Sequence, residues 1–236
     1  MTGIVSSTQA LAQEYDAIAH NLANANTVGF KRRVTVVSDS PAAGSAEEGA
    51  APELASESLL DLSQGRLVRT DRPLDVALHG QGFLVLESAQ GQLYTRAGVL
   101  HTSPDGRLVD AEGRAFVGAA GPITIPSTVS TMDVAIAQDG RILAAGQEIG
   151  RLRLVEFEDP KRLEAAGRNA YRAPQGLAPN DARRTTVHQG FQEASNVDVV
   201  TELVALIRVA RLYEANVKAM QAQGERSQDV LKVAMA

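Results

Sequence analysis

The two ends of the chain carry its most regular pattern of hydrophobic and polar positions. From residue 203 onward, small or apolar residues recur with gaps that alternate between three and four positions. They are Leu203, Leu206, Ala210, Tyr213, Val217, Met220, Gly224, Ser227, Leu231 and Ala234. This period of 3.5 residues is typical of a helix that packs along one seam against other helices. Further apolar residues widen the surface of the first two turns, namely Val199, Val200, Val204, Ile207 and Val209.

The start of this C-terminal helix is marked as well. Asn196 is a favourable cap, and Asp198 and Glu202 place negative charge near the positive end of the helix dipole. A helix of this length cannot fold back on a small core, so we expect it to need a partner surface.

The N-terminus repeats the same spacing and predicts a helix over about residues 6–23. Its seam positions are Ile4, Thr8, Leu11, Tyr15, Ile18, Leu22 and Ala25. Asn24, Asn26 and Gly29 follow, residue types that stop helices by adopting turn conformations. Two heptad segments with unrelated sequence between them favour a coiled coil in which the ends of the chain meet. The alternative is that each helix covers its own patch of the central domain.

The sequence between the helices changes character twice. After a Val-Thr-Val-Val run that could form a short strand, residues 38–58 are rich in Ala, Ser, Pro, Gly and Glu, which indicates a flexible or extended linker. From Leu74, short alternating runs follow one another with turn signals between them, such as residues 80–82 and 103–106. The longest alternating run is residues 150–157. Short strands at this spacing are typical of a sandwich or barrel-like β domain.

These patterns predict an α+β fold in three parts. Residues 1–33 and 190–236 form a helical inner domain, in which the terminal heptad helices make a coiled-coil layer. Residues 34–66 are the linker or extended segment, and residues 67–189 form a β-rich outer domain.

Composition excludes several classes of function. The chain has 236 residues, a net charge of −5 and no Cys, so there is no basic surface that favours nucleic acid, no disulfide and no thiolate site. Its first residues lack the features of a cleavable signal peptide, and no stretch is apolar enough to span a membrane. The four His residues lie far apart in the sequence, and no serine-nucleophile motif or phosphate-binding loop is present. We therefore expect no catalytic, cofactor-binding or metal-binding residues and no small-molecule substrate.

Four stretches of the chain together resemble the bacterial flagellar rod and hook protein family. They are residues 22–31 (Leu-Ala-Asn-Ala-Asn-Thr-Val-Gly-Phe-Lys), residues 72–85, residues 94–109, and residues 190–198 leading into Tyr213-Glu214-Ala215-Asn216. They occur in family order and cover both termini and the start of the β region.

The resemblance implies a non-enzymatic structural subunit of the flagellar basal-body rod. Such a subunit would polymerise through its terminal helices, with other copies of itself and other rod subunits, into part of the torque-transmitting drive shaft. It would leave the cell through the flagellar type III export apparatus without a cleaved signal peptide and reside in the rod that crosses the periplasm. The modest length and the region 121–126 resemble the proximal rod type, with the related distal rod type as the close alternative. Hook proteins are normally larger.

The resemblance and the heptad pattern together indicate an assembly interface. The candidate residues are Leu11, Tyr15, Ile18, Leu22, Asn24, Thr27, Gly29, Phe30, Leu203, Leu206, Ala210, Tyr213, Val217 and Met220. A protein of a different class stays open at this point: a soluble module whose β domain binds a ligand and whose helices dimerise it. Concentration-dependent formation of filaments or rings would separate the two.

Overall fold

The computed structural model describes residues 2–40 and 53–234, and the chain divides into two compact units. The helical unit comprises Met1–Ala23, Arg33–Leu59 and Asp198–Ala236 within those limits. The β unit comprises Asn24–Arg32 and Leu60–Val197. The chain therefore enters and leaves each unit more than once, and the two units are described separately.

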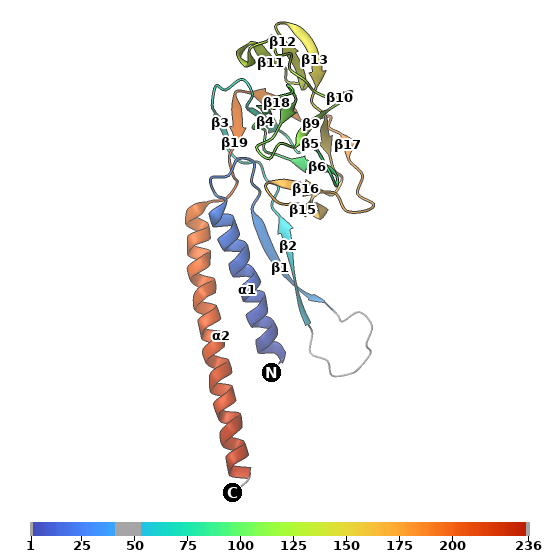
Figure 1. Ribbon diagram of the computed structural model, residues 1–236. Helices are drawn as coiled ribbons and strands as arrows, with labels where there is room; N and C mark the ends of the chain where they lie inside the picture. The colour runs from blue at the N-terminus through green and yellow to red at the C-terminus, as the bar shows by residue number, and fades with distance from the viewer. Residues whose placement is uncertain (1, 41–52, 235–236) are drawn as a thin grey trace. The chain divides into compact units, whose positions relative to one another are not determined.

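The helical unit contains two long helices and a two-stranded sheet. Helix α1 spans Thr2–Ala23 and helix α2 spans Val199–Ala234, and the two lie side by side (Figure 1). Strands β1 (Arg33–Ser40) and β2 (Glu53–Leu60) pair with each other, and β1 also packs against α1. The predicted linker, residues 34–66, therefore contains strands on both sides of residues 41–52, which lie outside the described residues. The pairing partner of β2 lies across that stretch, so a local pattern could not reveal it.

Side-chain contacts show that α1 and α2 are antiparallel. Asn21 contacts Glu202, Glu14 contacts Arg208, and Ser7 contacts Asn216, so residue numbers rise along one helix as they fall along the other. Helix α2 has 36 residues and α1 has 22, and α2 continues beyond the N-terminal end of α1 (Figure 1).

Both helix starts differ from the sequence-based expectation. Helix α1 begins at Thr2 rather than near residue 6. The cap of α2 is Asp198, whose Oδ1 accepts a hydrogen bond of 2.7 Å from the amide of Thr201. Asn196, the predicted cap, instead binds the backbone of Arg32 and Asp61 inside the β unit.

The β unit is built around one large sheet. Its strands are β5 (Phe83–Ser88), β6 (Gly91–Thr95), β7 (His101–Thr102), β8 (Leu108–Val109), β9 (Ala115–Gly118), β10 (Gly121–Pro122), β14 (Leu154–Glu156), β15 (Glu164–Ala165), β16 (Ala170–Arg172) and β17 (Asn180–Asp181). The main path runs β15-β16-β6-β5-β9-β8-β7, with β10 on β9, and β14 between β5 and β17.

Three smaller sheets complete the β unit. One is the meander β11 (Val134–Ile136), β12 (Arg141–Ala144) and β13 (Gln147–Arg151). The other two are antiparallel pairs of strands distant in sequence: β4 (Val76–His79) with β18 (Thr186–Gln189), and β3 (Leu67–Arg69) with β19 (Phe191–Glu193). Two 3₁₀ turns, Thr131–Asp133 and Pro160–Arg162, lie among the connections. Strand β19 extends the β unit beyond residue 189, the predicted boundary. The sequence did not indicate this, because β19 is short and its partner β3 is distant in the chain.

Strand β5 explains why the β unit has two hydrophobic cores. Successive side chains of a strand point to opposite faces of the sheet. Phe83 and Val85 belong to one buried cluster, whereas Leu84 and Leu86 belong to the other. All four are at most 1% exposed, so this strand is covered on both faces. The continuous apolar run in the sequence follows from that position.

Candidate assembly surface

Polar side chains make direct contacts between the two helices. Nδ2 of Asn21 donates to Oε2 of Glu202 at 3.3 Å, and both residues are fully buried. Nη2 of Arg208 lies 3.4 Å from Oε1 of Glu14. Among the helix residues whose burial the structure describes, the buried apolar ones are Ile18, which is 5% exposed, and Val209, which is 0% exposed. Contacts within the chain therefore use only part of the apolar surface that the helices carry.

The rows that face the partner helix lie one position away from part of the predicted seam. On α2 the buried positions are Glu202 and Val209, next to the predicted Leu203 and Ala210. Leu203 stays 42% exposed. On α1, Asn21 is buried next to the predicted Leu22, which is half-buried. Polar residues occupy much of the true contact row, so the hydrophobic pattern could not identify it.

The remaining predicted seam residues have mixed environments. Leu11, Leu206, Ala210, Val217 and Met220 are half-buried, Ile18 is buried, and Tyr15 and Tyr213 are each 42% exposed. The two tyrosines help line a groove of about 330 Å³ between the helices, together with Ala12, Asp16, Ala210 and Glu214. This groove brings together residues of both predicted seams and leaves their aromatic rings accessible.

A further apolar stripe lies on the face of α2 turned away from α1. Val200, Val204 and Ile207 are 69%, 63% and 56% exposed, and Leu203 borders them. At 100° per residue these four side chains share one side of the helix. We call them the outer stripe. Three of them were absent from the predicted interface, although their apolar character between the seam positions was visible in the sequence.

Four candidate interface residues follow α1 in the signature, by which we mean the stretch 22–31, and they lie in the β unit. Two of these four, Gly29 and Phe30, are buried. Gly29 adopts φ +69°, and a Cβ there would lie 2.5 Å from the backbone nitrogen of Ala97. Phe30 is 5% exposed. Asn24 and Thr27 are half-buried and hydrogen-bond each other. The structure therefore separates Gly29 and Phe30 from the exposed helix positions, because both are used in packing within their own chain.

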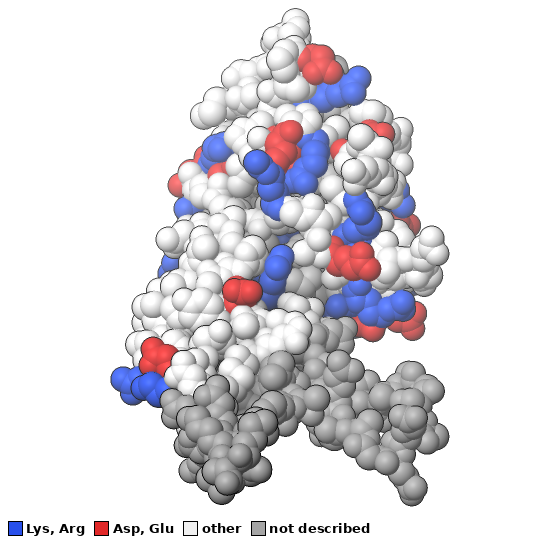
Figure 2. Space-filling view, turned by 60° about the horizontal axis from the view of Figure 1, so that its bottom comes forward, with Lys and Arg blue, Asp and Glu red and all other residues white. Residues whose placement is uncertain are grey.

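The described residues contain no cluster of three or more His, Asp or Glu side chains that could hold a metal ion. No helix in the described part of the chain has the length and apolar character needed to cross a membrane. Charged side chains of both signs are interspersed on the face shown in Figure 2.

Three family models match successive parts of the chain. The model for flagella basal body rod proteins matches residues 5–31, the model for the D1 domain of flagellar hook protein FlgE/F/G matches residues 77–144, and the model for the C-terminal part of flagellar basal body rod FlgEFG proteins matches residues 188–233. The matches therefore cover the start of α1 through the signature, the middle of the β unit, and α2.

Whole-length relatives give the same result. The flagellar basal-body rod protein FlgF of Caulobacter vibrioides is 31% identical over 97% of this chain and 94% of its own length. The rod protein FlgG of Agrobacterium fabrum is 31% identical over 92% of each chain. The rod protein FlgF of Salmonella typhimurium is 32% identical over 95% of this chain and 93% of its own length.

Proposed function

Because the chain belongs to the flagellar basal-body rod protein family and is a structural subunit of the rod, we propose that it joins its neighbours through two surfaces of the helical unit. They are the outer stripe and the groove that Tyr15 and Tyr213 help line. Assembly with other rod subunits in the basal body follows from the family. The alternative of a ligand-binding module dimerised by its helices is not favoured, because the similarity to rod proteins extends over nearly the whole chain.

The observation that carries this proposal is the placement of polar and apolar rows on the two helices. Side chains such as Asn21 and Glu202 are used within the chain, whereas Val200, Val204 and Ile207 remain exposed. An exposed apolar row on a soluble helix is unfavourable unless it is covered by a partner. A helix of another subunit fits this surface, because four apolar side chains in two turns match the width of one helix–helix contact.

Several finer features belong to the same proposal. The candidate interface residues Leu11, Tyr15, Ile18, Leu22, Leu203, Leu206, Ala210, Tyr213, Val217 and Met220 would form a coiled-coil layer of α1 and α2 with helices of neighbouring subunits. The helical unit would then make the inner part of the shaft, and the β unit the outer part. Export through the flagellar type III apparatus without a cleaved signal, and a proximal position in the rod with the distal position as the alternative, complete the proposal.

Cross-linking in isolated basal bodies tests the interface directly. The chain has no Cys, so each introduced Cys is the only thiol of the subunit. We expect Leu203→Cys and Ile207→Cys to give covalent products between subunits after treatment with a short bismaleimide. Ala219→Cys, at an exposed position of the same helix that lies to the side of the outer stripe, is the matched control. Products from Ala219→Cys alone would place the interface elsewhere on α2.

A further inference from the structure

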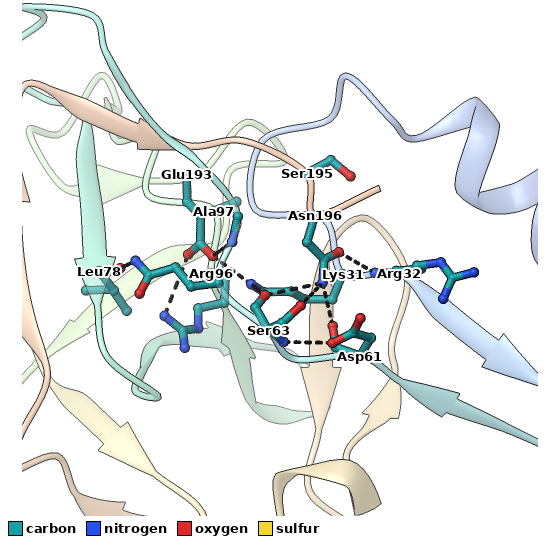
Figure 3. A network of polar contacts seen from close by, with 12 residues as sticks. Lys31, Arg32, Asp61, Ser63, Leu78, Arg96, Ala97, Glu193, Ser195 and Asn196 are labelled. Atoms are coloured by element: carbon teal, nitrogen blue, oxygen red, sulfur yellow. Dashed lines mark hydrogen bonds and ion pairs between the residues drawn. The ribbon is translucent and has the colours of Figure 1, made fainter. Parts of the chain in front are cut away.

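Three ionisable side chains meet in the interior of the β unit. The side chains of Lys31, Arg96 and Glu193 are 0%, 2% and 0% exposed (Figure 3). Nζ of Lys31 lies 2.6 Å from Oε1 of Glu193, and Nη1 of Arg96 lies 3.6 Å from Oε2. Burial lowers the pKa of Lys31, and the carboxylate of Glu193 opposes this shift. Two cations thus share one carboxylate in a site shielded from water.

The members of this cluster come from distant parts of the chain. Lys31 belongs to the stretch that follows α1, Arg96 follows strand β6, and Glu193 ends strand β19. Arg96 is held by its own contacts, because its Nη2 donates to the carbonyl of Gly80 and its guanidinium lies 5.2 Å from the ring centroid of Phe83. Arg96 is therefore a fixed part of the sheet, whereas Lys31 and Glu193 arrive on chain segments that lead to the two helices.

The segments that carry Lys31 and Glu193 also form hydrogen bonds with a third segment, residues 61–65. Nζ of Lys31 donates to the carbonyl of Ser63 at 2.7 Å, and the amide of Gly65 donates to Oε1 of Glu193 at 2.9 Å. Close by, Oδ1 of Asn196 accepts from the amide of Arg32 at 2.8 Å (Figure 3). Residues 29–32, 61–65 and 193–196 are therefore joined by direct hydrogen bonds, and each stretch lies next to a point where the chain passes from one unit to the other.

The geometry points to an interlock, by which we mean that residues 29–32 and 193–196 dock onto the β unit only together. Without Glu193, the ammonium of Lys31 would lie buried near the guanidinium of Arg96, which disfavours its charge. Without Lys31, Glu193 would keep only the amide of Gly65 at Oε1 and the more distant guanidinium of Arg96, 3.6 Å from Oε2. Leaving one charge of a buried pair without its partner is strongly unfavourable, so each docked segment makes the docking of the other more favourable.

A backbone contact between the same segments supports the interlock independently of charge. The amide of Gly29 donates to the carbonyl of Glu193 at 2.7 Å. The residue at position 29 must approach the backbone of Arg96 and Ala97 for this bond to form, and only glycine leaves the space. A chain that lacks either residues 29–32 or residues 193–196 therefore cannot form this backbone hydrogen bond, and this part of the β unit stays incomplete.

Hydrogen exchange in the full-length chain tests the interlock. The amide of Phe30, bonded to the carbonyl of Thr27, reports on the N-terminal segment, and the amide of Ala194, bonded to the carbonyl of Arg66, reports on the C-terminal segment. We expect Lys31→Met to speed exchange at Ala194, and Glu193→Gln to speed exchange at Phe30, each by about 10-fold or more. The double variant should show about the effect of one single variant rather than their product.

The control variant is Arg69→Met, which removes an ion pair with Asp71 whose side chains are both 71% exposed and should leave both reporters unchanged. If Lys31→Met does not fold, the exchange rate of the Phe30 amide in the Glu193→Gln variant is the deciding measurement. This variant keeps one native contact, because the side-chain oxygen of the introduced glutamine can still accept from the amide of Gly65. Acceleration confined to the mutated segment, or multiplicative effects in the double variant, would overturn the interlock.

Discussion

Asn21 and Glu202 lie 181 positions apart in the sequence and form a buried hydrogen bond between α1 and α2. Asn21 also donates to the carbonyl of Arg33 and accepts from its amide, both at 2.8 Å. One amide side chain thus joins both helices and the start of β1. It fixes where the polypeptide leaves α1 and which row of α2 faces that helix.

The first prediction follows from this arrangement. Asn21→Ala leaves the amide and carbonyl of Arg33 without their partner and removes a donor from a buried carboxylate. Each unsatisfied buried polar group costs about 1–3 kcal/mol, so we expect a loss of helical-unit stability of at least about 2 kcal/mol. Urea unfolding followed by circular dichroism at 222 nm measures it. Gln13→Ala, at an exposed position of α1, is the control, and an equal effect of both variants would contradict the assigned role.

A second prediction compares two adjacent residues of α2. Leu206 is half-buried, whereas Ile207 is 56% exposed in the outer stripe. Leu206→Asp should destabilise the isolated subunit by about 1 kcal/mol or more, while Ile207→Asp should change its stability by less than about 0.5 kcal/mol. Both should prevent incorporation into the rod, because each would bury an unpaired charge on assembly.

Thermal unfolding of the purified variants and swimming in soft agar separate these effects. Ala219→Asp adds the same charge at an exposed position to the side of the stripe and should support normal swimming. Normal swimming of the Ile207→Asp strain would show that the outer stripe is not an assembly surface.

The third prediction concerns the backbone at the signature. Gly29 and Gly113 both have positive φ, +69° and +79°, but only at Gly29 would a Cβ collide with neighbouring backbone. Gly113→Ala should cost about 1 kcal/mol from its backbone conformation alone. Gly29→Ala should cost at least about 2 kcal/mol more, because the backbone of Ala97 must move. Chemical denaturation of the two variants measures the difference, and similar costs would mean that this close approach is easily relaxed.

The fourth prediction concerns the pH dependence of α2. Hydrogen bonds from the amide and side chain of Thr201 and from the amide of Val200 lower the pKa of Asp198 below its ordinary value of 3.8. Since the unfolded helix end takes up the proton first, the cap stabilises α2 above about pH 4 and loses this contribution as the pH falls through the lowered pKa.

Asp198→Asn provides the comparison, because asparagine caps helices about as well and does not titrate in this range. Helicity followed from about pH 6 to about pH 2 should fall further in the parent chain than in the variant. Identical titration curves would show that Asp198 does not contribute to the acid sensitivity of α2.

The sequence by itself determined which segments become the long helices and the β region, and which family the chain belongs to. The 3.5-residue period at both termini predicted helices in the right places, because an apolar row of that period is a local property of a helix. The resemblance to rod proteins rested on contiguous stretches, and the comparisons confirm it. The extended runs from Leu74 onward likewise predicted the β-rich centre of the α+β fold.

The tertiary structure alone decided which faces and charges meet. The row of α2 that faces α1 contains Glu202 and Asn216, so a pattern of apolar residues pointed one position away from it. Lys31 and Glu193 are 162 positions apart, and nothing local indicates that either charge is buried. Pairings of this kind depend on which distant segments the fold brings together. Burial then makes the polar contacts specific, because an unpaired polar group inside the protein costs free energy that water would otherwise offset.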